Sequence, residues 1–175
     1  KNKEYKDILF INGCTLPHPE RYRVAHQIEQ LISQGLTADS VFYDRLSLDQ
    51  LKYYRGFVFF RCPITDTVRD FIKQANYFNK TCFFDIDDLV IDQKYTDSIE
   101  YVQKMSDEDK CLYNDGVNRM RETLTLCSHA ITTTTQLQEE LQKYIKGQVL
   151  INRNVASDEM ISRSNAAIKA VNKDE

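Results

Sequence analysis

Glycine and proline are scarce in this sequence: its 175 residues include five glycines and three prolines. No flexible linker is therefore expected inside the chain, which is long enough for one sizeable domain. No apolar run approaches the roughly 20 residues needed to cross a bilayer. The first six residues are mostly polar or charged, so no secretory signal is expected there.

The sequence also lacks a long basic block, and its net charge is -3. Both features argue against nucleic acid as the main partner. Five cysteines are present, an odd number, and no two have the C-x-x-C spacing. Because no close cysteine pair lies near any of the three histidines, we expect reduced thiols in a cytoplasmic protein and no metal site.

Six short apolar runs alternate with segments of helical periodicity. Most runs are continuously apolar, as is typical of strands covered on both faces. The predicted strands are 8–11, 40–43, 57–60, 81–86, 129–132 and 148–151. Because repeated strand–helix–strand units give right-handed crossovers, the sequence predicts an α/β fold. We expect a Rossmann-like, doubly wound, mostly parallel sheet of about six strands flanked by helices.

The starts and inner faces of several helices can also be predicted. Apolar spacing marks one face of a helix over 20–34, with Gly35 as its stop. The candidate N-caps of three further helices are Thr65, Ser106 and either Thr134 or Thr135. In the helix after Ser106, the residues expected to face inward are Leu112, Val117, Met120 and Leu124. Residues 47–54 predict a short helix and 156–170 a last one.

Ligands of open parallel sheets bind beyond the carboxyl ends of the strands. Gly13 follows the first predicted strand, but the other glycines of the dinucleotide motif G-x-G-x-x-G are missing, which argues against NAD or FAD. Arg21 and Arg23, near a helix start, are candidates for binding phosphate or carboxylate. The other candidates at strand ends are Arg61, Asp85, Asp87, Asp88 and Thr133.

The three aspartates between Asp85 and Asp88 are the sharpest local feature. Like charges this close raise one another's pKa unless a cation or hydrogen-bond donors compensate. The segment resembles the first motif of haloacid-dehalogenase phosphatases, with Asp85 as nucleophile and Asp87 as acid/base. Against this, Leu89 replaces the Thr or Val of that motif and no later acidic pair follows. The segment also contains the D-x-D pattern with which GT-A glycosyltransferases bind a metal and a nucleotide diphosphate.

The order of several motifs along the chain carries a third resemblance. A glycine loop at Gly13 precedes a helix containing Tyr22-Arg-Val-Ala-His-Gln-Ile-Glu29, and Arg61-Cys-Pro63 ends a strand. Asp85-Ile-Asp-Asp-Leu89 ends the next strand, and Thr132-Thr-Thr-Thr135 the one after it. Together they resemble the N-terminal domain of GT-B glycosyltransferases of the bacterial group 1, family 4-like type. Asn152-Arg-Asn-Val155 departs from the V-I-P-N-G-V common there, since it lacks the proline and glycine.

The resemblance implies a specific division of work. Residues 1–155 are expected to form the Rossmann-like, acceptor-side domain, and 156–175 a helix that begins the connection to a second, donor-binding domain. The implied partners are a nucleotide-sugar donor and a sugar or glycan acceptor, with no cofactor and no metal. The implied location is cytoplasmic, and a peripheral contact with the inner face of the membrane stays open. A chain without the donor domain is not expected to transfer sugar.

The resemblance also assigns roles to residues. It places Gly13, Tyr22 and Arg23 beside the donor phosphates. It places Arg61, Asp85 and Thr133 on the acceptor side, and makes Asp87 and Asp88 the catalytic candidates that hydrogen-bond a sugar hydroxyl. The alternatives that stay open are a phosphatase using Asp85 and Asp87, and a non-catalytic α/β domain that binds a ligand or a protein, because fold alone does not fix function.

Overall fold

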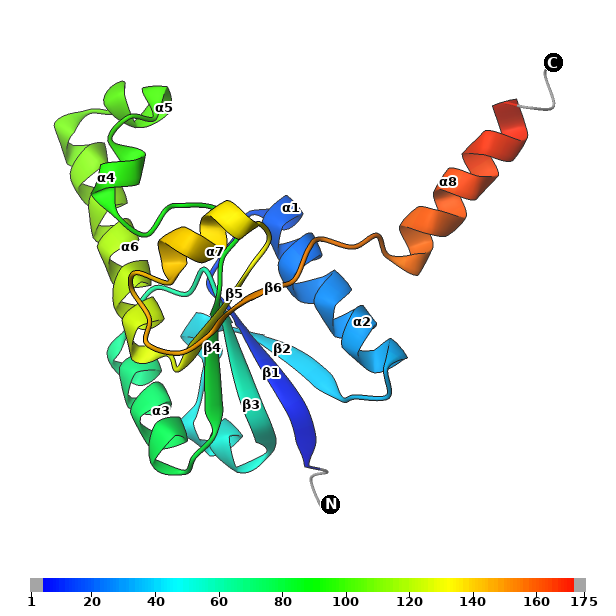
Figure 1. The fold of residues 1–175 in the computed structure, drawn as a ribbon, viewed down its shortest axis with the longest axis horizontal. Helices are drawn as coiled ribbons and strands as arrows, with labels where there is room; N and C mark the ends of the chain where they lie inside the picture. Colours follow the sequence, from blue (N-terminus) through cyan, green and yellow to red (C-terminus); the bar gives the residue numbers. More distant parts are fainter. Residues whose placement is uncertain (1–4, 172–175) are drawn as a thin grey trace.

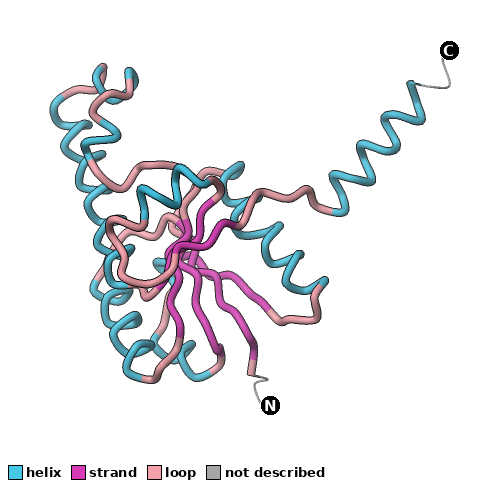
Figure 2. The backbone as a smooth tube through the Cα atoms, viewed as in Figure 1, coloured by secondary structure: helices cyan, strands magenta, loops and turns pink. Residues whose placement is uncertain are grey.

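One sheet of six strands organises the chain. In a computed structural model, which describes residues 5–171, all pairs of neighbouring strands are parallel. The strand order is β2-β1-β3-β4-β5-β6 (Figures 1 and 2). The strands are β1 (Lys6–Asn12), β2 (Ala38–Phe42), β3 (Tyr54–Phe60), β4 (Thr81–Asp85), β5 (His129–Thr132) and β6 (Val149–Ile151). This confirms the Rossmann-like α/β fold, and each predicted strand overlaps an observed one.

The helices lie on both faces of this sheet. Figure 1 shows α2 on the opposite side of the sheet from α3 and α6. The longer helices are α2 (His26–Ser33), α3 (Asp66–Tyr77), α6 (Asp107–Leu126), α7 (Thr135–Leu141) and α8 (Asp158–Val171). The shorter ones are α1 (Pro17–Glu20), the π-helical turn η1 (Arg21–Ala25), the 3-10 turns η2 (Tyr43–Arg45) and η3 (Leu48–Lys52), α4 (Gln93–Thr96) and α5 (Glu100–Gln103).

The helix caps follow the sequence prediction. The hydroxyl oxygens of Thr65, Ser106 and Thr134 each accept a backbone N–H from the first turn of α3, α6 and α7, at 3.1, 3.1 and 3.2 Å. Each such cap satisfies a donor that has no partner within the helix. Gly35 has a φ of +79° just after α2, a conformation that favours glycine, so it ends that helix as expected.

Side chains of β3 alternate between two hydrophobic cores. Phe57 and Phe59 point into the larger core, where Phe71 of α3 meets their rings edge-on at centroid distances of 4.7 and 6.1 Å. Val58 and Phe60 point into the smaller core under α2. All five side chains are buried. Because each large apolar side chain removed from water contributes about 1.5–3 kcal/mol, β3 anchors both layers of the fold.

One predicted inner face is only partly correct. Val117 and Leu124 of α6 are buried, but Leu112 is 68% exposed. The first half of α6 extends beyond the sheet together with α4 and α5 (Figure 1). Helical spacing places Leu112 on the same face as the core residues. However, the part of α6 that contains Leu112 extends past the sheet, so the sheet does not cover this side chain. The prediction that Leu112 faces inward is therefore wrong.

The final helix, α8, projects away from the rest of the chain (Figure 1). It confirms the helix expected over 156–170, and residues 172–175 of the expected connection lie outside the described part of the chain. Among the described residues, no helix is both long enough and apolar enough to span a membrane.

Candidate functional site

Backbone hydrogen bonds hold the carboxyl ends of five strands together. One residue past a strand, an N–H donates to the neighbouring strand: Gly13 to the Phe60 oxygen at 2.8 Å and Arg61 to the Asp85 oxygen at 3.0 Å. Two further bonds, from Ile86 to Ile131 and from Asn152 to Thr132, continue the series at 3.1 and 2.7 Å. The candidate residues at this edge therefore stand on a rigid frame.

The first aspartate of the cluster is part of a buried ion pair. Arg23 of η1 donates through Nε and Nη2 to the two carboxylate oxygens of Asp85, at 3.0 and 2.8 Å. The side chains are 0% and 2% exposed. Burial raises the pKa of Asp85 to about 7, and the Arg23 guanidinium opposes that rise. Both groups of the pair are thus closed off from solvent.

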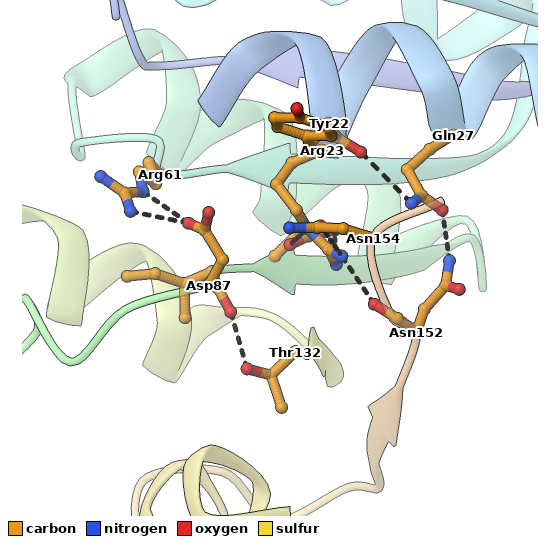
Figure 3. Close-up of polar contacts among 10 residues, drawn as sticks. Tyr22, Arg23, Gln27, Arg61, Asp87, Thr132, Asn152 and Asn154 are labelled. Carbon is orange, nitrogen blue, oxygen red and sulfur yellow. Dashed lines mark hydrogen bonds and ion pairs between the residues drawn. The ribbon is translucent and has the colours of Figure 1, made fainter. Parts of the chain in front are cut away.

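The same arginine fastens the segment that leaves the sheet after β6. Arg23 Nη1 donates to the carbonyl of Asn152 at 2.6 Å and to Asn154 Oδ1 at 3.2 Å (Figure 3). The Gln27 side chain accepts from Asn152 Nδ2, and His26 Nδ1 bonds the carbonyl of Val155 at 2.8 Å. One face of η1 and α2 therefore holds 152–155 in place, which gives Arg23 and Asp85 a structural role that sequence reasoning did not assign.

Asp87, two residues after Asp85, forms a second ion pair, and its partner is Arg61 just after β3; this pair is partly exposed. Arg61 Nε and Nη2 both approach Asp87 Oδ1, at 2.9 and 2.7 Å (Figure 3). The two side chains are each 16% exposed. This arrangement leaves the second oxygen of Asp87, Oδ2, for another donor. Arg61 also has a φ of +41°, an uncommon conformation outside glycine that is found at functional sites more often than elsewhere.

Two neighbours complete the surroundings of this pair. Asp88 is exposed, and its Oδ1 accepts the N–H of Leu89 at 2.8 Å. Burial raises the pKa of Tyr113 in α6, the charge of Asp88 adds to the rise, and Arg61 counteracts it. Tyr113 thus lies within electrostatic reach of both residues, a proximity that sequence spacing could not indicate.

The three other predicted residues take separate positions. Thr133 follows β5 and is half-buried, next to Thr132, whose hydroxyl donates to the Ile86 carbonyl at 2.7 Å. Tyr22 is half-buried and meets the His26 ring edge-on at 5.2 Å. A Cβ on Gly13 would lie 2.4 Å from Cys62 Cα, so close backbone packing alone requires glycine there. The predicted contacts of these three residues with ligands stay predictions.

The geometry bears on two alternatives, a phosphatase and a metal-binding site. A phosphatase nucleophile must reach its substrate, but Asp85 is 1% exposed and both its oxygens accept from Arg23. The arrangement of Asp85 therefore does not favour the haloacid-dehalogenase alternative. Across residues 5–171, no three side chains of histidine, cysteine, aspartate or glutamate gather in a way that could hold a metal ion. The arrangement offers the partly exposed Asp87 carboxylate, which Arg61 orients and which is suited to accepting a hydrogen bond from a hydroxyl.

Comparisons with known proteins add little to this description. No family model matches the sequence, and no curated protein matches it. Among solved structures, the chain is similar to the TIR domains of the activated Roq1 resistosome directly recognizing the pathogen effector XopQ. The identity is 12%, the match covers 66% of this chain and 82% of that one, and the TM-score is 0.36.

Proposed function

We propose that the chain is the acceptor-binding half of a GT-B glycosyltransferase, which moves a sugar from a nucleotide-sugar to a hydroxyl group of a glycan or another acceptor. The observation that carries the proposal is the Arg61–Asp87 pair at the carboxyl edge of the sheet. It is partly exposed, it stands on a rigid frame, and it lies where ligands of such sheets bind. The order of the motifs along the chain is the second support.

The pair suits the acceptor side of the reaction. In glycosyl transfer, the acceptor oxygen bonds to the sugar carbon as the bond from that carbon to the nucleotide diphosphate breaks, and the hydroxyl proton passes from that oxygen to Asp87 Oδ2. Asp87 Oδ2 accepts the hydrogen bond of the hydroxyl and orients it, while Arg61 fixes the carboxylate through Oδ1. Asp88 stands beside this position as a further acceptor. The nucleotide-sugar binds mainly to the second domain.

The fastening of 152–155 also fits this proposal. In a two-domain enzyme the segment after the sixth strand leads toward the second domain. Arg23, His26 and Gln27 hold that segment against the first domain. These three residues belong to the helix motif at 22–29, and the segment that they hold is the motif at 152–155. Two motifs of the resemblance are therefore in contact with each other.

The experiment that tests the proposal is a transfer assay on the full gene product. It is incubated with a panel of radiolabelled nucleotide-sugars and a mixture of glycan and lipid-linked acceptors, and labelled product is measured. The proposal expects transfer from one donor, lost in Asp87→Asn. Absence of transfer from every donor, together with hydrolysis of phosphate esters that a folded Asp85→Asn variant lacks, would overturn it in favour of the phosphatase.

A further inference from the structure

A hollow of about 450 Å³ opens beside the Asp88–Leu89 turn, and no residue that lines it is among the predicted site residues. Its walls come from the loop after β4, from α4, and from α7 with the residue preceding it. Leu89 borders it directly after Asp88, and Thr134 borders it directly after Thr133. The hollow therefore begins one residue along the chain from Asp88 and from Thr133, two residues of the proposed acceptor side. Its volume lies in the usual range for pockets of small ligands, roughly 300–1,000 Å³.

An aromatic ring is held firmly at its wall. Tyr95 is half-buried and packs against the larger hydrophobic core. Its hydroxyl donates to the Glu140 carboxylate, and Glu140 is held in turn by Lys143 at 2.6 Å. The Lys94 ammonium lies 4.6 Å from the centre of the Tyr95 ring. The ring is thus fixed from several sides while part of it still lines the hollow.

The rest of the lining combines apolar carbons with uncharged and acidic oxygen groups. Leu89 and Leu137 add to the apolar surface around Tyr95. Thr134, Gln136 and Glu139 are exposed and carry a hydroxyl, an amide and a carboxylate. Sugars match this mixture because their rings present C–H faces and their hydroxyl groups both donate and accept hydrogen bonds. The two lining carboxylates, Glu139 and Glu140, are balanced by two ammonium groups close by: Lys143 pairs with Glu140, and Lys94 lies against the Tyr95 ring. The described surroundings of the hollow therefore have no excess charge of either sign that would select an ionic ligand.

We infer that this hollow, between Leu89, Tyr95 and Gln136, binds an uncharged sugar unit of the acceptor. The inference rests on the proposed function and deepens it, because it names a neutral sugar as the acceptor unit next to Asp88. The ring of that sugar lies against Tyr95 and the two leucines, and its hydroxyl groups bond Gln136 and Glu139.

Saturation-transfer-difference NMR on the chain tests this inference without requiring activity. The probes are four neutral methyl glycosides (glucoside, galactoside, rhamnoside and N-acetylglucosaminide), with glucuronic acid and glucose 1-phosphate as anionic comparisons. The variants are Tyr95→Ala and Gln136→Ala, and the second keeps the test valid if the first unfolds the chain. Tyr77→Ala is the matched control, because Tyr77 is 82% exposed in α3, outside the hollow.

We expect at least one neutral glycoside to give a signal that falls at least fivefold in both folded variants and stays unchanged in Tyr77→Ala. The anionic probes should give weaker signals than that glycoside. The inference is overturned if no neutral glycoside binds, if the anions bind as well, or if neither folded variant weakens the signal. A signal that responds to Asp87→Asn but not to Gln136→Ala would refute this subsite alone and leave the proposed function standing.

Discussion

Two arginine–aspartate pairs at the same edge of one sheet differ in what surrounds them. Arg23–Asp85 is closed, with side chains 0% and 2% exposed and a guanidinium that also bonds the segment after β6. Arg61–Asp87 is open, with 16% of each side chain exposed and both contacts on one carboxylate oxygen. Asp85 and Asp87 are two residues apart and are of the same type, yet their surroundings suit them to different roles. The closed pair holds the structure, and the open pair is available to a ligand.

The largest effect is expected from breaking the closed pair. Arg23→Ala leaves the Asp85 carboxylate buried without its partner, and removing one member of a buried pair costs about 3–5 kcal/mol. Urea unfolding followed by circular dichroism measures the loss. The matched control is Arg55→Ala, because Arg55 is 70% exposed in its pair with Asp7 and should cost no more than about 1 kcal/mol. Equal losses for both variants would contradict a structural role for Arg23.

Replacing both members of the closed pair should be milder than removing one. The double variant Arg23→Met, Asp85→Leu leaves no buried charge, so the remaining cost comes from the Asn152 carbonyl that loses its donor, about 1–3 kcal/mol. Unfolding of the double variant is compared with that of each single variant. If the double variant were less stable than Arg23→Ala, the pair would contribute more to the free energy of unfolding than the neutralisation of each charge by the other.

Breaking the open pair should hardly affect stability. Arg61→Ala removes a partly exposed ion pair, and we expect a loss of about 1 kcal/mol or less in the free energy of unfolding. Sugar transfer by the full gene product should nevertheless fall at least tenfold, since the Asp87 carboxylate is no longer oriented. If stability fell as far as in Arg23→Ala, the distinction between the two pairs would be lost.

The smallest effect on stability is expected at Asp7, which lies at the amino end of β1, at the opposite end of the strands from the two pairs. The backbone N–H and the hydroxyl of Thr37 donate to Asp7 and lower its pKa. Because the folded pKa lies below the unfolded value of about 3.9, this carboxylate stabilises the fold above that pH and ceases to do so as the pH falls through its folded pKa. Asp7→Asn should therefore lower stability slightly at pH 6 and by less at pH 3, which is below the unfolded pKa. An equal difference at both pH values would contradict the sign.

The sequence predicted the fold well where the signal is local. Apolar runs located all six strands, and the hydroxyl caps of α3 and α6 lie where short-range chemistry indicated, at Thr65 and Ser106. Leu112 was misplaced because helical spacing does not reveal where the sheet beneath a helix ends. Whether a helix face is covered depends on its tertiary neighbours.

The candidate site was predicted less completely. Its location at the strand ends followed from a general rule of parallel sheets. The partner of each charge did not, because Arg23 and Asp85 are 62 residues apart and only folding brings them together. Tyr95 gave no signal in the sequence either, since its place beside the site depends on the path of α4 above the sheet.

The most direct test of the account is a paired measurement on Asp87→Asn in the full gene product. Stability and the rate of sugar transfer are determined on the same preparation. We predict a free energy of unfolding within about 1 kcal/mol of the unmodified protein and a rate at least about 100-fold lower, as for the loss of a positioned proton acceptor. Unchanged transfer in a stable variant would contradict the role of the open pair, and a collapse of stability would contradict its difference from the closed one.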